Sequence, residues 1–215
     1  MLSIRYKADS LIECGIDEAG RGSLWGSLYA GAVIWKDESE WNDEIRSLSE
    51  MIKDSKKLSK KKRDLIYEGI KKHARSYAIG IVTAKEIDTL GMSKANKLAF
   101  QRALESLTVT PQRILLDGIL PFETSIELVY QPEMDNTYLS VAAASILAKV
   151  SRDNDIVKHV ESFKELQEKY DLMNNKGYGT LKHRNGILKN GKDTFHRNLF
   201  LRKLLGTSNC LIHDE

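Results

Sequence analysis

The chain has 215 residues, of which 41% are hydrophobic and 29% are charged, a balance typical of a soluble globular protein and unlike that of a disordered chain. This length favours one domain with a single core and argues against two large domains. The net charge of +3 is too small to establish nucleic-acid binding by itself.

The N-terminus and the cysteines exclude two further classes of protein. Residues 1–10 contain charged side chains and no long apolar run, so we expect neither a signal peptide nor a membrane anchor, and hence a cytoplasmic protein. Cys14 and Cys210 are too few for a disulfide framework or a cysteine-based metal site.

Apolar runs and helical periodicity predict the elements. In chain order they are strands over 11–17 and 28–35, a helix over 60–73, a strand over 77–82, a helix over 92–107, strands over 114–116 and 126–130, and a helix over 138–150. The glycine-rich stretch EAGRGSLWGS joins the first two strands in a tight turn. In the first helix we expect Leu65, Ile66 and Ile70 to face inward.

The order of these elements predicts the fold class. Strands cluster early and alternate with helices, which indicates one mixed α/β domain with a central sheet and a helical C-terminal part. Residues 173–193 are polar and contain four glycines, so we expect a surface loop region around a short helix.

One segment is strongly basic. Residues 53–63, KDSKKLSKKKR, contain six lysines and one arginine, a local charge suited to phosphates. Taken alone, the segment is better explained as the solvated start of a helix. Basic side chains at a helix N-terminus oppose the helix dipole, and an anionic partner would offset that cost.

Acidic residues stand at strand ends or beside a helix start at three places: Asp17 with Glu18, Asp117, and Asp135. Carboxylates that converge from separate strands repel one another unless a cation joins them. Mg²⁺ or Mn²⁺ is the expected cation, because both prefer oxygen ligands and the sequence offers no histidine or cysteine cluster for zinc. For any single acid, a solvated strand end or a helix cap is the better explanation.

The segment GIDEAGRG at residues 15–22 resembles the N-terminal signature of the ribonuclease HII family. Further matches follow in the family's order and span most of the chain: DSKKLS at 54–59, LLDG at 115–118, Asp135 shortly before AAASILAKVSRD at 142–153, KGYGT at 176–180, and HR at 196–197.

The resemblance implies a ribonuclease H-like fold, with a catalytic domain over 1–160 and a helical C-terminal region over 161–215 packed on it. It implies an endoribonuclease that hydrolyses the RNA strand of RNA/DNA hybrids and cuts 5′ to ribonucleotides embedded in duplex DNA. The implied reaction uses two Mg²⁺ or Mn²⁺ ions and leaves 5′-phosphate and 3′-hydroxyl ends. We expect a monomer whose partner is the duplex, and nothing in the sequence supports a sliding-clamp partner.

Site residues are carried over from the same motifs. The implied catalytic and metal-binding carboxylates are Asp17, Glu18, Asp117 and Asp135. The implied substrate-binding residues are Gly20, Arg21, Gly22, Lys56, Lys57, Ser145, Lys149 and Tyr178. The backbone of the GRG turn can approach a ribose closely, where the 2′-hydroxyl can donate to a carbonyl and accept from an N–H.

Each assignment has a structural alternative. The two glycines can simply make a turn, and Tyr178 can pack within its loop rather than stack on a sugar. Asp153 is interpreted as a structural acid or one that acts through a neighbour. His183 and His196 are more simply structural residues with hydrogen bonds than catalytic ones.

The sequence departs from the family pattern in two places. Ser23 and Ser27 stand where the family usually has prolines, with the bulky Trp25 between them, which predicts a less rigid loop. The approach to Asp135 lacks the usual glycine and lysine, so Glu133 is the alternative acid.

Two other functions compete with the ribonuclease. One is a related nuclease or recombinase of the same fold that acts on DNA, and the other is a catalytically silent module that binds hybrids. The acids argue against the silent module, because carboxylates beside a phosphate repel it when no metal is bound.

Overall fold

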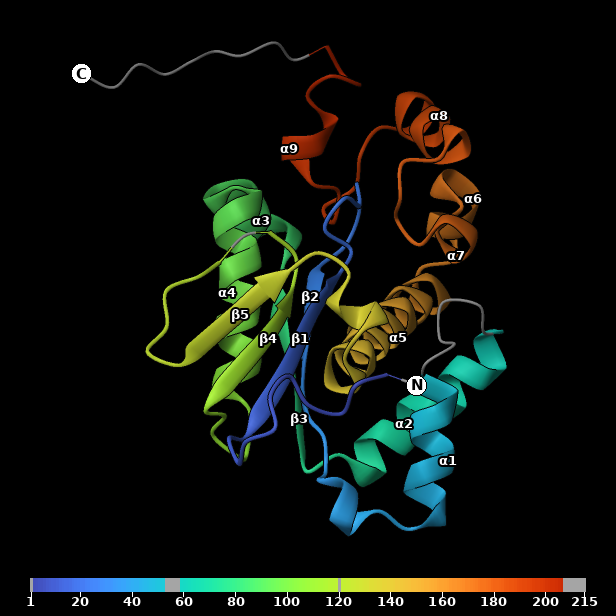
Figure 1. The fold of residues 1–215 in the computed structure, drawn as a ribbon. Helices are drawn as coiled ribbons and strands as arrows, with labels where there is room; N and C mark the ends of the chain where they lie inside the picture. The colour runs from blue at the N-terminus through green and yellow to red at the C-terminus, as the bar shows by residue number, and fades with distance from the viewer. Residues whose placement is uncertain (1, 53–58, 120, 207–215) are drawn as a thin grey trace, which may run out of the picture.

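A computed structural model of the chain describes residues 2–52, 59–119 and 121–206. Its centre is a five-stranded sheet of order β3-β2-β1-β4-β5 (Figure 1). Neighbouring strands are antiparallel from β3 to β1, whereas β4 and β5 run parallel to β1. The predicted mixed sheet is therefore confirmed. The strands are β1 Glu13–Ala19, β2 Leu28–Ile34, β3 Ser76–Val82, β4 Arg113–Asp117 and β5 Glu127–Gln131.

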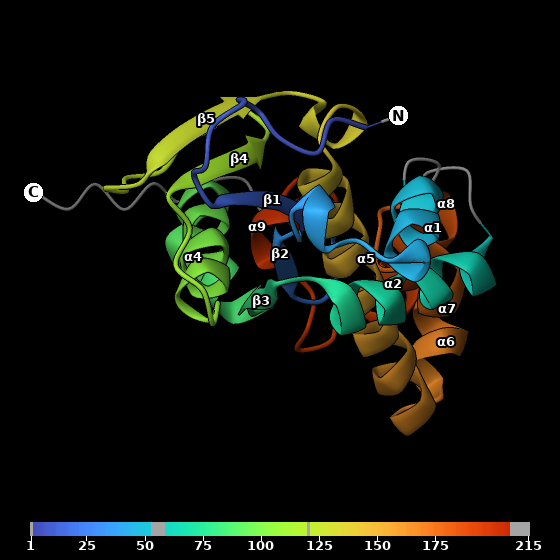
Figure 2. The same cartoon turned by 60° about the horizontal axis from the view of Figure 1, so that its bottom comes forward.

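Helices cover both faces of the sheet, α4 on one face and α5 with α1 and α2 on the other (Figures 1 and 2). The helices are η1 Glu38–Glu40, α1 Asp43–Ile52, α2 Lys60–His73, α3 Ala84–Leu90, α4 Met92–Glu105, η3 Met134–Asn136, α5 Leu139–Ser162, α6 Glu165–Tyr170, α7 Leu172–Asn175, α8 Leu181–Asn190 and α9 Asn198–Leu201. The three predicted helices correspond to α2, α4 and the first half of α5, whereas α1 and α3 were not predicted.

The long helix α5 packs unusually close to the sheet, because small residues face each other across the contact. A Cβ atom at Gly31 of β2 would lie 2.3 Å from the carbonyl oxygen of Ala144 in α5. Gly31 pairs with Asp17 of β1, and paired residues in an antiparallel sheet present their side chains on the same face. The sheet face that contacts α5 therefore carries Asp17.

One detail of the predicted inner face of α2 is wrong. Ile66 and Ile70 are buried as expected, but Leu65 is 63% exposed. Residues four apart share one face of a helix, whereas Leu65 is rotated by about 100° from its neighbour Ile66 and so points towards solvent.

The C-terminal helices form a smaller core of their own. Trp25, from the loop between β1 and β2, packs in it with Ile156 of α5, Tyr170 of α6 and Ile187 of α8. The boundary predicted at residue 160 lies inside α5, and the division into 1–160 and 161–215 remains a prediction. None of the helices in the described ranges is long and apolar enough to cross a membrane.

Candidate active site

Strand register brings two of the predicted acids together. Ile16 of β1 pairs with Leu116 of β4 in the parallel ladder, so the next residues, Asp17 and Asp117, are neighbours at the carboxyl ends of adjacent strands. The third acid, Asp135, lies in η3, and the backbone N–H of Met134 donates to the Asp117 carboxylate at 3.0 Å. Carboxylate oxygens of Asp17, Asp117 and Asp135 all lie within 4.8 Å of one another.

Burial and like charge make this cluster electrostatically unfavourable without a counter-ion. Asp17 is 9% exposed, and its burial, together with the nearby Glu18 and Asp117 charges, raises its pKa well above the usual range. Hydrogen bonds from the Ser145 hydroxyl and from the Glu18 backbone N–H, the latter at 2.7 Å, oppose that rise. An all-carboxylate set of this kind suits a hard divalent cation with oxygen ligands.

Glu18 lies beside this cluster but not within it. Successive side chains of a strand point to opposite faces, so Asp17 faces α5 while Glu18 faces α4. There Glu18 accepts a hydrogen bond from Asn96 and lies 3.7 Å from the Arg21 guanidinium. Its burial raises the pKa of its carboxyl, and the Arg21 charge partly offsets this effect.

The two alternatives for the last acid differ clearly in position. Asp135 is buried and belongs to the cluster, whereas Glu133 is exposed and is the left-handed residue, with φ of 64°, that begins η3. The structure therefore brings Asp135, and not Glu133, to the other acids.

The GRG turn follows β1 directly and has two different glycines. A Cβ atom at Gly20, whose φ is 88°, would lie 2.1 Å from Nε of Arg152. A Cβ atom at Gly22 would meet nothing within 4 Å. The surroundings of Gly20 are thus filled by the protein itself, whereas the space beside Gly22 is open to a ligand.

The loop that follows the turn is not loose, despite its missing prolines. Ser23 is fully buried; its hydroxyl donates to the Trp25 carbonyl at 2.8 Å and accepts from Nη2 of Arg152 at 2.7 Å. Trp25 is 1% exposed, and its indole N–H donates to the Asp193 carboxylate at 3.0 Å. Hydrogen bonds and burial therefore replace the rigidity that prolines would give.

The KGYGT segment packs directly against this loop. The Gly177 carbonyl accepts from the backbone N–H groups of Leu24, at 2.8 Å, and Trp25, at 3.3 Å. Tyr178 is 42% exposed, with the Arg152 guanidinium 5.5 Å from its ring centroid. Tyr178 is therefore not a core aromatic, and it shares one surface with the GRG turn.

The remaining predicted residues have varied positions. Lys149 of α5 is partly exposed and forms an ion pair with Asp153 at 3.3 Å. Lys56 and Lys57 lie outside the described residues. His183 and His196 are buried, and their Nε2 atoms are 3.1 Å apart, an arrangement that agrees with the structural interpretation of both.

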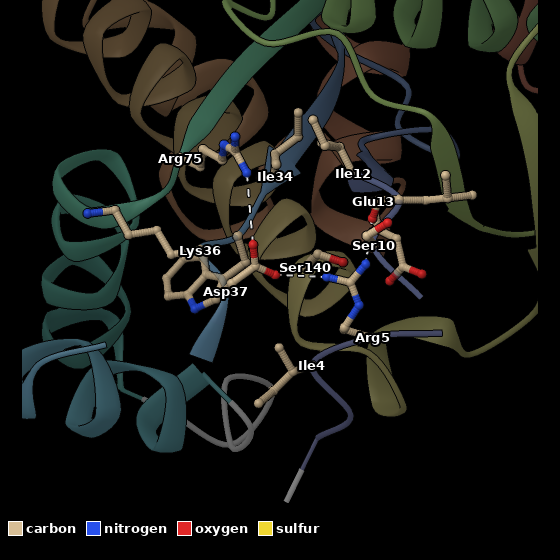
Figure 3. A pocket seen from close by; sticks show the side chains of 12 residues that line it. Ile4, Arg5, Ser10, Ile12, Glu13, Ile34, Lys36, Asp37, Arg75 and Ser140 are labelled. Atoms are coloured by element: carbon tan, nitrogen blue, oxygen red, sulfur yellow. Dashed lines mark hydrogen bonds and ion pairs between the residues drawn. The ribbon is translucent and has the colours of Figure 1, made fainter. Parts of the chain in front are cut away.

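Figure 3 shows a pocket at the other end of β1, beside Glu13. Asp37 lines this pocket and forms ion pairs with two other lining residues, Arg5 at 2.8 Å and Arg75 at 3.9 Å. Its volume of about 40 Å³ suits ordered water rather than a nucleotide. The pocket lies at the opposite end of β1 from Asp17 and so is separate from the acidic cluster.

Three buried polar residues near the site were not predicted. Asn96 contacts Glu18, and Arg152 and Arg197 donate hydrogen bonds to the loop after β1. A signal existed for Arg152, because it continues the spacing of the buried Ala144 and Ala148 along α5. A charged residue on an apolar helical stripe indicates a specific buried partner.

The mixed sheet with helices on both faces, and with acids clustered at the ends of adjacent strands, is the arrangement expected of the ribonuclease H class. The family model for Ribonuclease HII matches residues 14–203. The chain is 40% identical to the Ribonuclease HII of Bacteroides thetaiotaomicron over an alignment of 208 residues, and the alignment covers 94% of each sequence. The chain therefore belongs to the ribonuclease HII family and is an endoribonuclease, as the motifs predicted.

Solved structures agree with this assignment. The ribonuclease H2 of Pyrococcus horikoshii OT3 superposes with a TM-score of 0.73 at 27% identity, over 91% of this chain and 97% of that one. The RNase HII of Archaeoglobus fulgidus, solved in complex with PCNA, gives 0.69 at 26% identity, over 87% and 94%. The predicted ribonuclease H-like fold is confirmed.

Proposed function

We propose that this enzyme cuts RNA/DNA hybrids and DNA duplexes with embedded ribonucleotides on the 5′ side of a ribonucleotide, leaving 5′-phosphate and 3′-hydroxyl ends. The observation that carries the proposal is the cluster of Asp17, Asp117 and Asp135 within 4.8 Å, close in the chain to a turn with open space at Gly22. The cluster supplies the charge for hydrolysis, and the turn supplies the contact to the sugar.

Asp17, Asp117 and Asp135 are the residues that would hold a divalent cation, Mg²⁺ or Mn²⁺, while the side chain of Glu18 lies beside this set and faces α4. A cation bound there would activate water and stabilise the charge that develops on the phosphate and the leaving oxygen. Ser145 fixes the Asp17 carboxylate by its hydrogen bond. The carboxylates thus act as ligands, and none of them has to be a nucleophile.

The substrate contacts come from other residues of the same surface. Arg21 is partly exposed and is placed for a phosphate, as is Lys149. Tyr178 offers an exposed aromatic face to the sugar that follows the ribonucleotide. Each of these side chains reaches solvent, as a residue that binds a duplex must.

The test uses the full chain and an RNA/DNA hybrid labelled in turn at each end of each strand. In Mg²⁺ or Mn²⁺ we expect cuts in the RNA strand only, with 5′-phosphate and 3′-hydroxyl ends, and no cutting in EDTA. Asp17→Asn serves as the control for contaminating nuclease. Cutting that persists in EDTA, or products with 2′,3′-cyclic phosphates, would rule out metal-dependent hydrolysis at this site.

A further inference from the structure

Two arginines are buried behind the GRG turn. Arg152 is 2% exposed and Arg197 is fully buried, and burial is the main cause that lowers the pKa of both, to about 9 for Arg197. A guanidinium with this pKa still carries its charge at pH 7. Removing a charge from water is costly, so two such residues need a specific reason.

Arg197 bonds to the turn itself. Its Nη1 donates to the carbonyl of Gly20 at 2.6 Å and to that of Arg21 at 3.2 Å, while its Nε donates to the Gly26 carbonyl at 2.8 Å. All three acceptors are uncharged backbone oxygens of one loop. The fork of the guanidinium, with several donors in one plane, suits such a set.

These contacts fix which way the turn's peptide groups face. In a planar trans peptide the C=O and N–H bonds point in opposite directions, and no described residue has a cis peptide bond. Because the Gly20 and Arg21 carbonyls face Arg197, the N–H groups of Arg21 and Gly22 face away from it. Neither N–H donates to another residue in the described ranges. Adjacent free N–H groups form a small concave donor site.

Arg152 holds the rest of the loop. Besides Ser23, it donates to the carbonyls of Trp25 at 3.1 Å and Ser27 at 3.2 Å, and to that of Lys176 at 2.9 Å. It also fills the space beside Gly20, so the turn cannot move inward. The two arginines thus brace the turn and the segment before Tyr178 as one unit.

We propose that Arg197, supported by Arg152, is a positioning residue that presents the N–H groups of Arg21 and Gly22 to the ribose 2′-hydroxyl. This inference rests on the proposed function of the turn. It also revises the expected contact, because Arg197 occupies two of the turn's carbonyls and the hydroxyl is therefore recognised mainly as an acceptor. A positive charge behind the two carbonyls polarises both peptide groups and strengthens their N–H donors.

The test compares Arg197→Lys with Arg113→Lys. Arg113, at the start of β4, is also buried, at 2% exposed. It forms ion pairs with Asp9 and with Glu13 at the start of β1 and lies at the opposite end of that strand from the turn, so it serves as a matched control. On a duplex with one ribonucleotide we expect Arg197→Lys to lower kcat by about ten- to a hundredfold, with KM changed less than about threefold. Arg113→Lys should lower the melting temperature without lowering kcat per folded molecule.

A second readout does not depend on catalysis. In the free protein, the amide resonances of Arg21 and Gly22 should shift in Arg197→Lys and stay unchanged in Arg113→Lys. Wild-type kcat together with unshifted amides in Arg197→Lys would overturn the inference. A wild-type enzyme that cuts ribonucleotide and plain DNA duplexes equally would instead refute the proposed function.

Ser23→Ala decides the question if Arg197→Lys does not fold. This change removes one hydroxyl from the contacts of Arg152 and leaves both arginines in place. We expect kcat to fall by about three- to tenfold with KM unchanged, in line with one lost hydrogen bond. A kcat equal to that of wild type would overturn the bracing role.

Discussion

At the scale of single residues, the charge of the clustered carboxylates matters more than their shape. Asp117→Asn keeps the size of the side chain and its acceptor for the Met134 N–H, but a neutral amide binds a divalent cation poorly. We expect the fold to be retained and cleavage to fall by about a hundredfold or more in saturating Mg²⁺. Cleavage rates and melting temperatures measured together check this, and near-normal activity would contradict it.

The choice between Asp135 and Glu133 gives a paired prediction. Asp135→Asn removes a buried carboxylate of the cluster and should reduce cleavage strongly, whereas Glu133→Gln changes an exposed side chain and should leave cleavage within about twofold of wild type. Both variants are compared on the same hybrid at several Mg²⁺ concentrations. The reverse order of activities would mean that Glu133 is the functional acid.

The two glycines of the turn should respond differently to alanine. Gly20→Ala combines a left-handed φ with a clash against Arg152, so we expect it to destabilise the fold by about 2 kcal/mol or more. Gly22→Ala meets open space and should change stability by less than about 0.5 kcal/mol while reducing cleavage. Denaturant unfolding and cleavage assays separate the two effects. Equal loss of stability in both variants would contradict this account.

The residues that could be predicted are those whose chemistry is visible in the sequence. Asp17 and Asp117 follow apolar runs, and glycines flank Arg21, so the acidic cluster and the turn could be predicted from residue type and motif. The HR motif marks Arg197, but its role could not be predicted, because nothing in its neighbourhood in the chain shows that it is fully buried against a loop more than 170 positions earlier.

At the scale of elements, the positions of the strands in the chain were easier to predict than which strands pair with each other and in which register. Each strand is a short apolar run, but the register that pairs Ile16 with Leu116 depends on contacts across the fold. Helix α1 was missed although Ile45, Leu48 and Ile52 have helical spacing and are buried, because charged and polar residues separate these apolar positions. The separation of Asp17 from Glu18 to opposite faces follows directly from strand geometry.

A chain of hydrogen bonds links the C-terminal helices to the Tyr178 segment and predicts a pH dependence. The Tyr178 carbonyl can only accept, so Nδ1 of His183 carries the proton, and Nε2 of His183 accepts from His196. Burial is the main cause that lowers the pKa of His183 below its usual value. Below a pH of about 6.5 the unfolded chain therefore binds more protons than the folded one. The stability of the folded protein consequently decreases as the pH is lowered.

We expect the wild-type melting temperature to fall between pH 7 and pH 5 more steeply than that of His183→Gln. The contribution of one proton is at most about 1.4 kcal/mol per pH unit. His159→Gln is the matched control, because His159 lies in the same region and is partly exposed. An unchanged pH slope in His183→Gln would exclude His183 as the titrating group.

At the scale of the whole molecule, segments from the N-terminal and C-terminal halves of the chain meet at one surface. The loop after β1 is held by Arg152, Asp193 and Arg197, all from the C-terminal half of the chain, and it lies next to the segment that carries Tyr178. The C-terminal half of the chain therefore helps to build the surface proposed to bind the sugar, while β1, β4 and η3 supply the clustered acids.

The central claim is that this surface recognises one 2′-hydroxyl beside a metal-binding cluster. The most direct measurement is the cleavage of three matched duplexes, with one ribonucleotide, none, or one 2′-O-methyl nucleotide at the same position, mapped at nucleotide resolution. A deoxynucleotide leaves turn donors unpaired, at roughly 1 to 3 kcal/mol each, which slows cutting by about ten- to a hundredfold per donor. We predict a single cut 5′ to the ribonucleotide and little cutting of the other two duplexes. Equal cutting of all three would contradict ribose recognition by Gly20, Arg21 and Gly22 and would favour a DNA nuclease of the same fold.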